Sequence, residues 1–159
     1  MAVVRVNLVV ASAESGKMKL ILENWRKYLA EGVSYNMPNF EYEWSEAQRY
    51  PQLKELGQEG WIQLAQTGAP LQVKPEMLKQ IGNTTAASTQ VAVEEFDNLE
   101  PDKQQRFMDA FKSGNIELPI VVKIGGKLDL LGGNTRFTGL VANNVMPQVW
   151  LIDVDKNIS

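Results

Sequence analysis

Hydrophobic and polar positions alternate over residues 3–10, and this period of two predicts a strand with one buried face. The apolar side chains of residues 18–29 then recur three and four positions apart, which predicts an amphipathic helix that ends at Gly32. The chain therefore opens with an expected strand followed by an expected helix.

The pattern changes over residues 33–44, which contain a proline and several aromatic side chains. This composition predicts a loop, with a short strand at residues 40–44. Ser45 and Gln48 have the spacing of a capping box, so we expect a helix to begin there. The same helix should break at Pro51, because the proline ring cannot continue it.

A candidate domain boundary follows. Pro75 suits the first position of a short helix, and Gly82 is its expected end. Residues 83–89 are small and polar, which is typical of a linker. We therefore predict an N-terminal α/β extension over residues 1–82 and a second unit over residues 83–159.

The second unit has the clearer pattern. Gly125 and Gly126 form a two-residue hairpin signal between two apolar runs, and Gly132 and Gly133 separate the second run from a helix. We expect in order a strand, a helix, two strands, a helix and a strand, over residues 90–96, 101–114, 118–124, 127–131, 134–143 and 149–154. This order predicts an α+β (mixed α/β) fold, with the N-terminal extension packed on the second unit.

The composition narrows the possible chemistry. The 159 residues include no cysteine and no histidine, which excludes disulfides, Cys or His zinc sites, thiol nucleophiles and histidine acid–base catalysis. A metal would need oxygen ligands, which suits magnesium or calcium rather than zinc or copper. The net charge of −3 gives no basic footprint for duplex nucleic acid. No apolar run is long enough to span a membrane and no signal peptide is evident, so we expect an intracellular protein with no membrane partner.

The most informative segment runs from the second strand of the hairpin into the next helix. Gly132 and Gly133 allow the backbone to approach a ligand closely, and a helix start offers free N–H groups with partial positive charge. Asn134, Thr135 and Arg136 add polar donors, so the segment predicts an anion site, most naturally for phosphates. The alternative is a plain strand-to-helix turn in which Asn134 caps the helix and Arg136 lies on the surface.

Three further groups of residues are weaker candidates. Lys123 and Lys127 flank the hairpin, and either can reach the same anion or simply be solvated. Tyr35, Tyr42 and Trp44 can form a stacking surface for a base, or pack in a core. Acidic residues precede the helix expected at residues 101–114 and can supply a base, a magnesium ligand or only a favourable helix start, namely Glu94, Glu95, Asp97, Glu100 and Asp102.

The Pro-Ile-Val strand that begins at Leu118, the Gly-Gly hairpin and the Gly-Gly-Asn-Thr-Arg box at a helix start together resemble the ParB/sulfiredoxin superfamily. The resemblance covers about residues 90–153. Members bind nucleoside triphosphates with this box, and they include chromosome-partitioning CTPases, sulfiredoxins, ADP-dependent free-serine kinases and phage ParB-like proteins. The resemblance therefore implies a ParB/sulfiredoxin-like nucleotide-binding unit, and it suggests a phage-encoded protein.

The resemblance also implies roles for single residues. The box residues Gly132 to Arg136 would contact phosphates, and Lys123 matches a strand lysine that approaches nucleotide phosphates in sulfiredoxins. The serine kinases use as base a glutamate just before the first helix, and Glu100 holds the closest position here, with Asp97 as a rival. Sulfiredoxins carry cysteine and histidine in the box, so this chain is not expected to reduce sulfinic acids.

These observations predict an ATP-dependent phosphotransferase (kinase) or NTPase that uses Mg²⁺ and acts on a hydroxyl acceptor. The acceptor would be a small hydroxyl compound or a modified nucleobase in nucleic acid. Two alternatives remain open: a non-enzymatic module that binds a nucleotide or a protein, and a ParB-like DNA-binding protein or nuclease.

Overall fold

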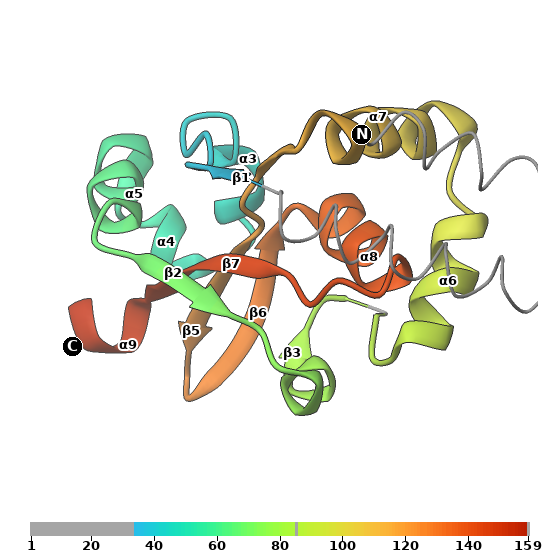
Figure 1. The fold of residues 1–159 in the computed structure, drawn as a ribbon. Helices are drawn as coiled ribbons and strands as arrows, with labels where there is room; N and C mark the ends of the chain where they lie inside the picture. The colour runs from blue at the N-terminus through green and yellow to red at the C-terminus, as the bar shows by residue number, and fades with distance from the viewer. Residues whose placement is uncertain (1–33, 85, 159) are drawn as a thin grey trace, which may run out of the picture.

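A computed structural model describes residues 34–84 and 86–158 of the protein (Figure 1). The strand predicted at residues 3–10 and the helix predicted at residues 18–29 lie outside the described residues. The fold is α+β, as the sequence predicts. No helix in the two described stretches combines the length and the apolar character that a membrane span requires.

A five-stranded mixed sheet lies at the centre of the fold (Figure 1). β5 is parallel to β7 and antiparallel to β6; β2 is antiparallel to β7, and β3 is parallel to β6. The strands lie in the order β2-β7-β5-β6-β3 and comprise Ala69–Gln72, Gln148–Asp153, Ile120–Ile124, Lys127–Gly132 and Ile81–Gly82. Strands from both sides of the linker predicted at residues 83–89 therefore share one sheet.

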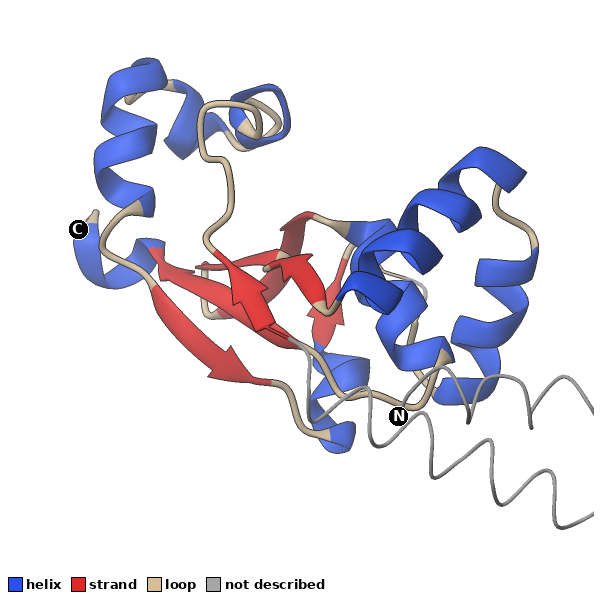
Figure 2. Ribbon diagram, turned by 45° about the horizontal axis from the view of Figure 1, so that its top comes forward, coloured by secondary structure: helices blue, strands red, loops and turns tan. Residues whose placement is uncertain are grey.

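A second, two-stranded sheet joins β1 (Ser34–Asn36) to β4 (Asn115–Glu117) in parallel. Helices lie on either side of the five-stranded sheet (Figure 2). They are α3 (Trp44–Ala47), α4 (Pro51–Lys54), α5 (Gly57–Ala65), the 3₁₀ helix η1 (Pro75–Gln80), α6 (Thr89–Asp97), α7 (Pro101–Ser113), α8 (Asn134–Ala142) and α9 (Val154–Asn157).

Successive side chains of β5 face opposite cores. Ile120 and Val122 pack in the core formed with α3, α4 and α5, while Val121 packs in the core formed with α6 and α8. Side chains of a strand alternate between its two faces, so this strand is buried on both sides. That explains why its sequence reads as a continuous apolar run rather than as an alternation.

Helix α8 connects the sheet to α7. Phe137 and Val141 of α8 face the sheet, and Leu140 packs with Phe107 of α7. A Cβ on Gly139 would lie 2.7 Å from ring atoms of Phe107, so only a glycine lets the two helices approach this closely. The start of α8 is therefore held firmly between the sheet and α7.

Several predicted turns and helix ends are confirmed. Gly125 and Gly126 both have positive φ, 61° and 75°, as a tight hairpin turn requires. The carboxylate of Asp155 accepts hydrogen bonds from both of their N–H groups, at 2.7 and 2.8 Å. Pro101 begins α7, which ends before Gly114 at φ 80°, and the predicted break at Pro51 separates α3 from α4.

The strand predicted at residues 90–96 is wrong, because this segment lies within α6. The Ser88 side chain accepts a hydrogen bond from the Val91 N–H at 3.2 Å and caps the helix. Ala92 is buried and Val93 is exposed. Val91 and Val93 are two positions apart, as apolar residues on one face of a strand would be. The side chain that is buried is Ala92 between them, which lies on the inner face of the helix.

The prediction for residues 40–44 is also wrong, because they form a turn that leads into α3 and the nearby strand is β1. The predicted capping box at Ser45 and Gln48 is not formed. Helix α3 begins one residue earlier, at Trp44, and its N-cap residue is Glu43, whose side chain makes no capping hydrogen bond. The Glu43 carboxylate is therefore left for other contacts.

Candidate functional site

The box predicted from the sequence lies where β6 passes into α8. Gly133 has φ 86° and occupies the N-cap position, so Asn134 is the first helical residue rather than the cap. The first intrahelical bond runs from the Phe137 N–H to the Gly133 carbonyl at 2.8 Å. The preceding N–H groups have no intrahelical acceptor, and Gly133 has no side chain to cap them. The helix start is thus open to an anion.

A pocket of about 580 Å³ lies over this helix start. All five box residues line it, together with residues from α3, α7 and the loop after β3. The lining comprises Tyr42, Glu43, Ser45, Glu46, Arg49, Asn83, Lys103, Leu130, Leu131, Gly132, Gly133, Asn134, Thr135 and Arg136. Three of these side chains are cationic and two are acidic, so the pocket carries a positive balance on a chain whose net charge is −3.

Arg136 lies across the glycine turn. Its Nη2 is 3.4 Å from a carboxylate oxygen of Glu117, in a partly buried ion pair. Within the described part of the chain, its Nε and Nη2 are buried and have no hydrogen-bond partner. A Cβ on Gly133 would lie 2.7 Å from this Nη2 and 2.9 Å from the Cα of Pro119, and the residue has φ 86°, so a side chain at this position would be strained. Buried donors without acceptors are costly, and an anion in the pocket would satisfy them.

Glu43 contributes the one buried carboxylate among the described residues, with 5% of its surface exposed. Burial raises the pKa of this carboxyl, which the nearby Arg136 guanidinium partly offsets, while Glu117 and Glu46 raise the pKa further. A Cβ on Gly132 would overlap the Glu43 carboxylate, so the acid lies directly against the glycine turn. Neither of its oxygens accepts a hydrogen bond from a described residue.

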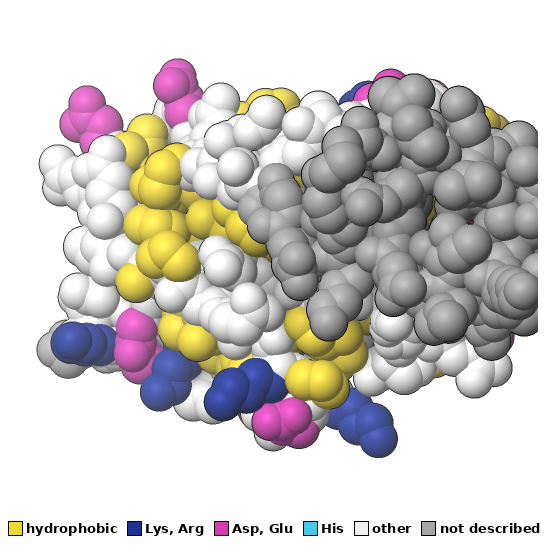
Figure 3. All heavy atoms as spheres, viewed as in Figure 1, with side chains coloured by type: hydrophobic (Ala, Val, Ile, Leu, Met, Phe, Trp, Pro, Cys, Tyr) yellow, Lys and Arg dark blue, Asp and Glu magenta, His cyan; other side chains and the backbone are white. Residues whose placement is uncertain are grey.

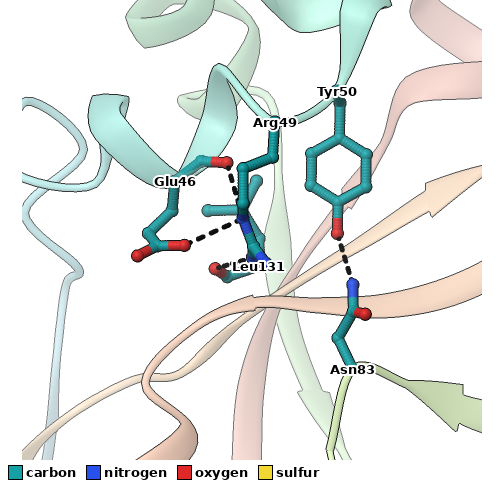
Figure 4. Close-up of polar contacts among 5 residues, drawn as sticks. All are labelled: Glu46, Arg49, Tyr50, Asn83 and Leu131. Carbon is teal, nitrogen blue, oxygen red and sulfur yellow. Dashed lines mark hydrogen bonds and ion pairs between the residues drawn. The ribbon is translucent and has the colours of Figure 1, made fainter.

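Another part of the pocket lining is built around Arg49, which follows α3 (Figure 4). Its Nη2 donates to the Leu131 carbonyl of β6 at 3.3 Å, and its Nε lies 2.9 Å from a Glu46 carboxylate oxygen. Beside it, the Asn83 amide donates to the Tyr50 hydroxyl at 2.9 Å. These contacts hold the segment after α3 against β6 and fix the width of the pocket.

The aromatic residues considered for base stacking separate into two groups. Tyr42 lines the pocket and is 76% exposed. Tyr35 and Trp44 are partly buried and pack on the hydrophobic cores. A stacking role is therefore available to Tyr42 alone among these three.

The other predicted site residues lie away from the pocket. Glu100 and Asp97 are exposed and do not line it. Lys103, one turn after Glu100, lines it instead, so the start of α7 supplies a cation rather than a carboxylate.

Lys123 does not line the pocket either. It pairs with Leu128, four residues before Gly132 on β6 and hence about 13 Å along the strand. Lys123 is therefore at the hairpin end of β5, and the β5–β6 hairpin lies at the lower edge of the molecule in Figure 1. On the face drawn in Figure 3, basic and acidic side chains gather along this edge.

We compared the chain with protein-family models, with curated proteins and with solved structures. Nothing matches. The likeness to the ParB/sulfiredoxin superfamily thus stays a prediction.

The pocket includes important residues that sequence reasoning did not identify, chiefly Glu43, Arg49 and Lys103. They lie 30 to 90 positions away from the box in the chain, and none belongs to a recognisable motif. In the described residues, no three acidic side chains gather as a metal site. A magnesium ion at this pocket would have to be held by phosphate oxygens with one carboxylate or two, which is a common arrangement for Mg²⁺.

Proposed function

We propose that the protein binds a nucleoside triphosphate in the pocket at the start of α8 and transfers its terminal phosphoryl group to a hydroxyl acceptor. The proposal adopts the ParB/sulfiredoxin-like assignment and takes ATP as the first nucleotide to test. One observation carries it: an open helix start, the unpartnered N–H groups of Arg136 and the buried carboxylate of Glu43 meet in a single pocket.

The phosphates would lie against the N–H groups of Asn134, Thr135 and Arg136, where the helix dipole favours negative charge. The Arg136 guanidinium would bind the transferring group, because its Nε and Nη2 make no hydrogen bond to a described residue, although Nη2 lies 3.4 Å from the Glu117 carboxylate, and the guanidinium fork matches phosphate oxygens. Arg49 and Lys103 would offset the remaining charge from the two side walls. Tyr42, exposed at the rim, is placed to stack on the base.

Glu43 would act as the general base in place of the predicted Glu100 or Asp97, because Glu43 lines the pocket and the other two acids do not. In the reaction, its carboxylate accepts the proton of the acceptor hydroxyl, and the oxygen lone pair forms the new bond to the terminal phosphorus. The bond to the bridging oxygen breaks, and its electrons leave with the nucleoside diphosphate. A raised pKa suits this role, because a base works best when its pKa lies near the operating pH.

Thermal-shift titration tests the binding step. We expect one of ATP, ADP, CTP and GTP, with or without Mg²⁺, to raise the unfolding temperature of the wild type by mass action. Arg136→Ala should abolish the shift, and Lys54→Ala, an exposed cation outside the pocket, should retain it. If no nucleotide shifts the wild type, the proposal fails.

Transfer needs a separate assay. Release of nucleoside diphosphate should be measured with candidate hydroxyl acceptors for the wild type, Glu43→Gln and Glu59→Gln. Glu59 is exposed on α5 and serves as the matched control. We expect Glu43→Gln to bind nucleotide and to lose at least a hundredfold in turnover, which is typical for a missing general base. Binding without turnover in the wild type would reduce the function to nucleotide binding.

A further inference from the structure

A second pocket, of about 290 Å³, lies beside the first, between α7 and the start of α8. Lys103, Arg106, Phe107 and Ala110 of α7 line it, with Thr135 and Arg136 of α8 completing the wall. Lys103, Thr135 and Arg136 line both pockets. The two spaces therefore meet at Arg136, whose buried Nε and Nη2 have no hydrogen-bond partner among the described residues.

The charged side chains that line the second pocket are all cationic. Three of its six lining residues are cations, and no acidic side chain lines it among the described residues. Besides Glu117, the only ion-pair partner of these cations within residues 34–84 and 86–158 is Asp102, which lies 3.9 Å from Arg106 with both side chains more than 70% exposed. Such an exposed pair is weak, so Arg106 is free to bind a ligand. On a chain of net charge −3, this concentration of cations favours an anionic ligand.

The remaining lining is Thr135, which adds a hydroxyl, and the apolar side chains of Phe107 and Ala110. Phe107 is buried and stacks with Phe111 at 5.6 Å between ring centroids. It also packs against α8, where Gly139 leaves room for its ring. An apolar floor beneath a cationic rim suits a ligand with a compact apolar face and a charged end, such as a sugar or base that carries a phosphate.

We propose that the second pocket is the acceptor subsite, and that the hydroxyl acceptor itself carries a phosphate or phosphodiester group. This inference rests on the function proposed for the first pocket. Lys103 and Arg106 bind the phosphate of the acceptor, Phe107 and Ala110 support its body, and its hydroxyl group points towards the transferring phosphoryl group at Arg136. The acceptor is therefore a nucleotide, a sugar phosphate or a nucleic-acid strand, which share this chemistry.

The two pockets can be tested separately, because each has a cation of its own. Arg106 lines only the second pocket and Arg49 only the first. With the first pocket saturated by a non-hydrolysable ATP analogue, we would titrate ribose 5-phosphate and a fluorescent eight-nucleotide single strand of thymidine. The variants are Arg106→Gln, Arg49→Gln and Lys112→Gln, the last an exposed lysine of α7 outside both pockets.

We expect Arg106→Gln to weaken binding of the phosphate probe about tenfold, the usual effect of one charged hydrogen bond, and to leave the thermal shift by the ATP analogue unchanged. Arg49→Gln should do the reverse, and Lys112→Gln should change neither. Ribose phosphate binding alone identifies a small acceptor. Tighter binding of the strand, with a steep salt dependence, identifies nucleic acid.

Three results would overturn the inference: neither probe binds, Arg106→Gln and Lys112→Gln behave alike, or the probe competes with the ATP analogue for one site. Failure of the first pocket looks different. In that case the ATP analogue gives no thermal shift, while the phosphate probe, titrated alone, still binds and responds to Arg106→Gln.

Discussion

The contact between Gly132 and Glu43 shows how one missing side chain shapes the pocket. A Cβ at position 132 would overlap the Glu43 carboxylate, although the backbone there is not in the left-handed region and would accept alanine. An alanine at this position would have to push the Glu43 carboxylate aside. The two residues should therefore respond to mutation as a pair.

We predict that Gly132→Ala lowers the free energy of unfolding by about 1–3 kcal/mol, the usual cost of overpacking. In a Glu43→Ala background the same substitution should cost much less, because the clashing carboxylate is gone. A double-mutant cycle by urea denaturation measures the coupling. Strictly additive effects would mean that the carboxylate and the glycine turn do not touch.

Glu43 also gives the stability a pH dependence. Because burial raises the pKa of its carboxyl in the folded protein, the unfolded chain ionises first as the pH rises. The contribution of this group is full below its ordinary pKa and is lost as the pH rises through the folded value. Glu43→Gln cannot ionise and should therefore gain stability relative to the wild type between pH 4 and pH 8.

The measurement is the urea midpoint of the wild type and Glu43→Gln at several pH values across this range. Glu59→Gln, at an exposed position, should follow the wild type at every pH. A difference between wild type and Glu43→Gln that is the same at pH 4 and pH 8 would contradict the prediction.

At the scale of elements, two serines near helix starts play different roles. Ser88 caps α6 through its hydrogen bond to the Val91 N–H, whereas Ser45 lies inside α3 and caps nothing. We predict that Ser88→Ala costs about 1 kcal/mol of unfolding free energy and that Ser45→Ala costs close to none. Thermal denaturation of the two variants side by side tests this. Equal losses would contradict the assigned caps.

Local signals predicted the elements that depend on backbone conformation alone. Gly125 and Gly126 predicted the hairpin, Pro101 predicted the start of α7, and Gly132 with Gly133 predicted the turn into α8. These signals are local, because proline restricts φ and glycine widens its allowed range wherever they occur. The strand prediction within residues 89–97 was wrong because Val91 and Val93 are spaced like the apolar residues of a strand. The segment is a helix that packs Ala92 in the core with α8.

Only part of the site could be predicted from the sequence. Its phosphate-binding half is one continuous segment, so the sequence revealed all five residues of the box. Its acid and its side walls come from α3, α7 and their flanking turns, which reach the pocket only through the packing of the sheet. The acidic residues near Glu100 were predicted as candidates because they lie close together in the sequence. The acid that lines the pocket is instead Glu43, from another part of the chain.

At the scale of the whole molecule, the shared sheet sets an expectation for unfolding. β2 and β3 precede the linker predicted at residues 83–89, and β5, β6 and β7 follow it, but all five strands pair in one sheet. Neither half can lose its strands without exposing the other. We therefore predict a single cooperative transition rather than one for each predicted unit.

Two substitutions on opposite faces of the sheet test this prediction. Leu53→Ala removes a buried side chain from the core with α3 to α5, and Val141→Ala removes one from the core with α6 and α8. Leu53→Ala should cost about 2–5 kcal/mol and Val141→Ala less. Both should move the same transition, seen together by tryptophan fluorescence and circular dichroism. Two transitions, each shifted by only one of the substitutions, would contradict it.

The outer strands of the five-stranded sheet bear on how the folded protein behaves at high concentration. β3 has only two residues, and β2 carries Pro70, which has no N–H to offer. A strand from another copy can add to a sheet only where a row of free N–H and C=O groups awaits it. Within the described residues, β2 and β3 are therefore poor templates for the addition of a strand from another copy.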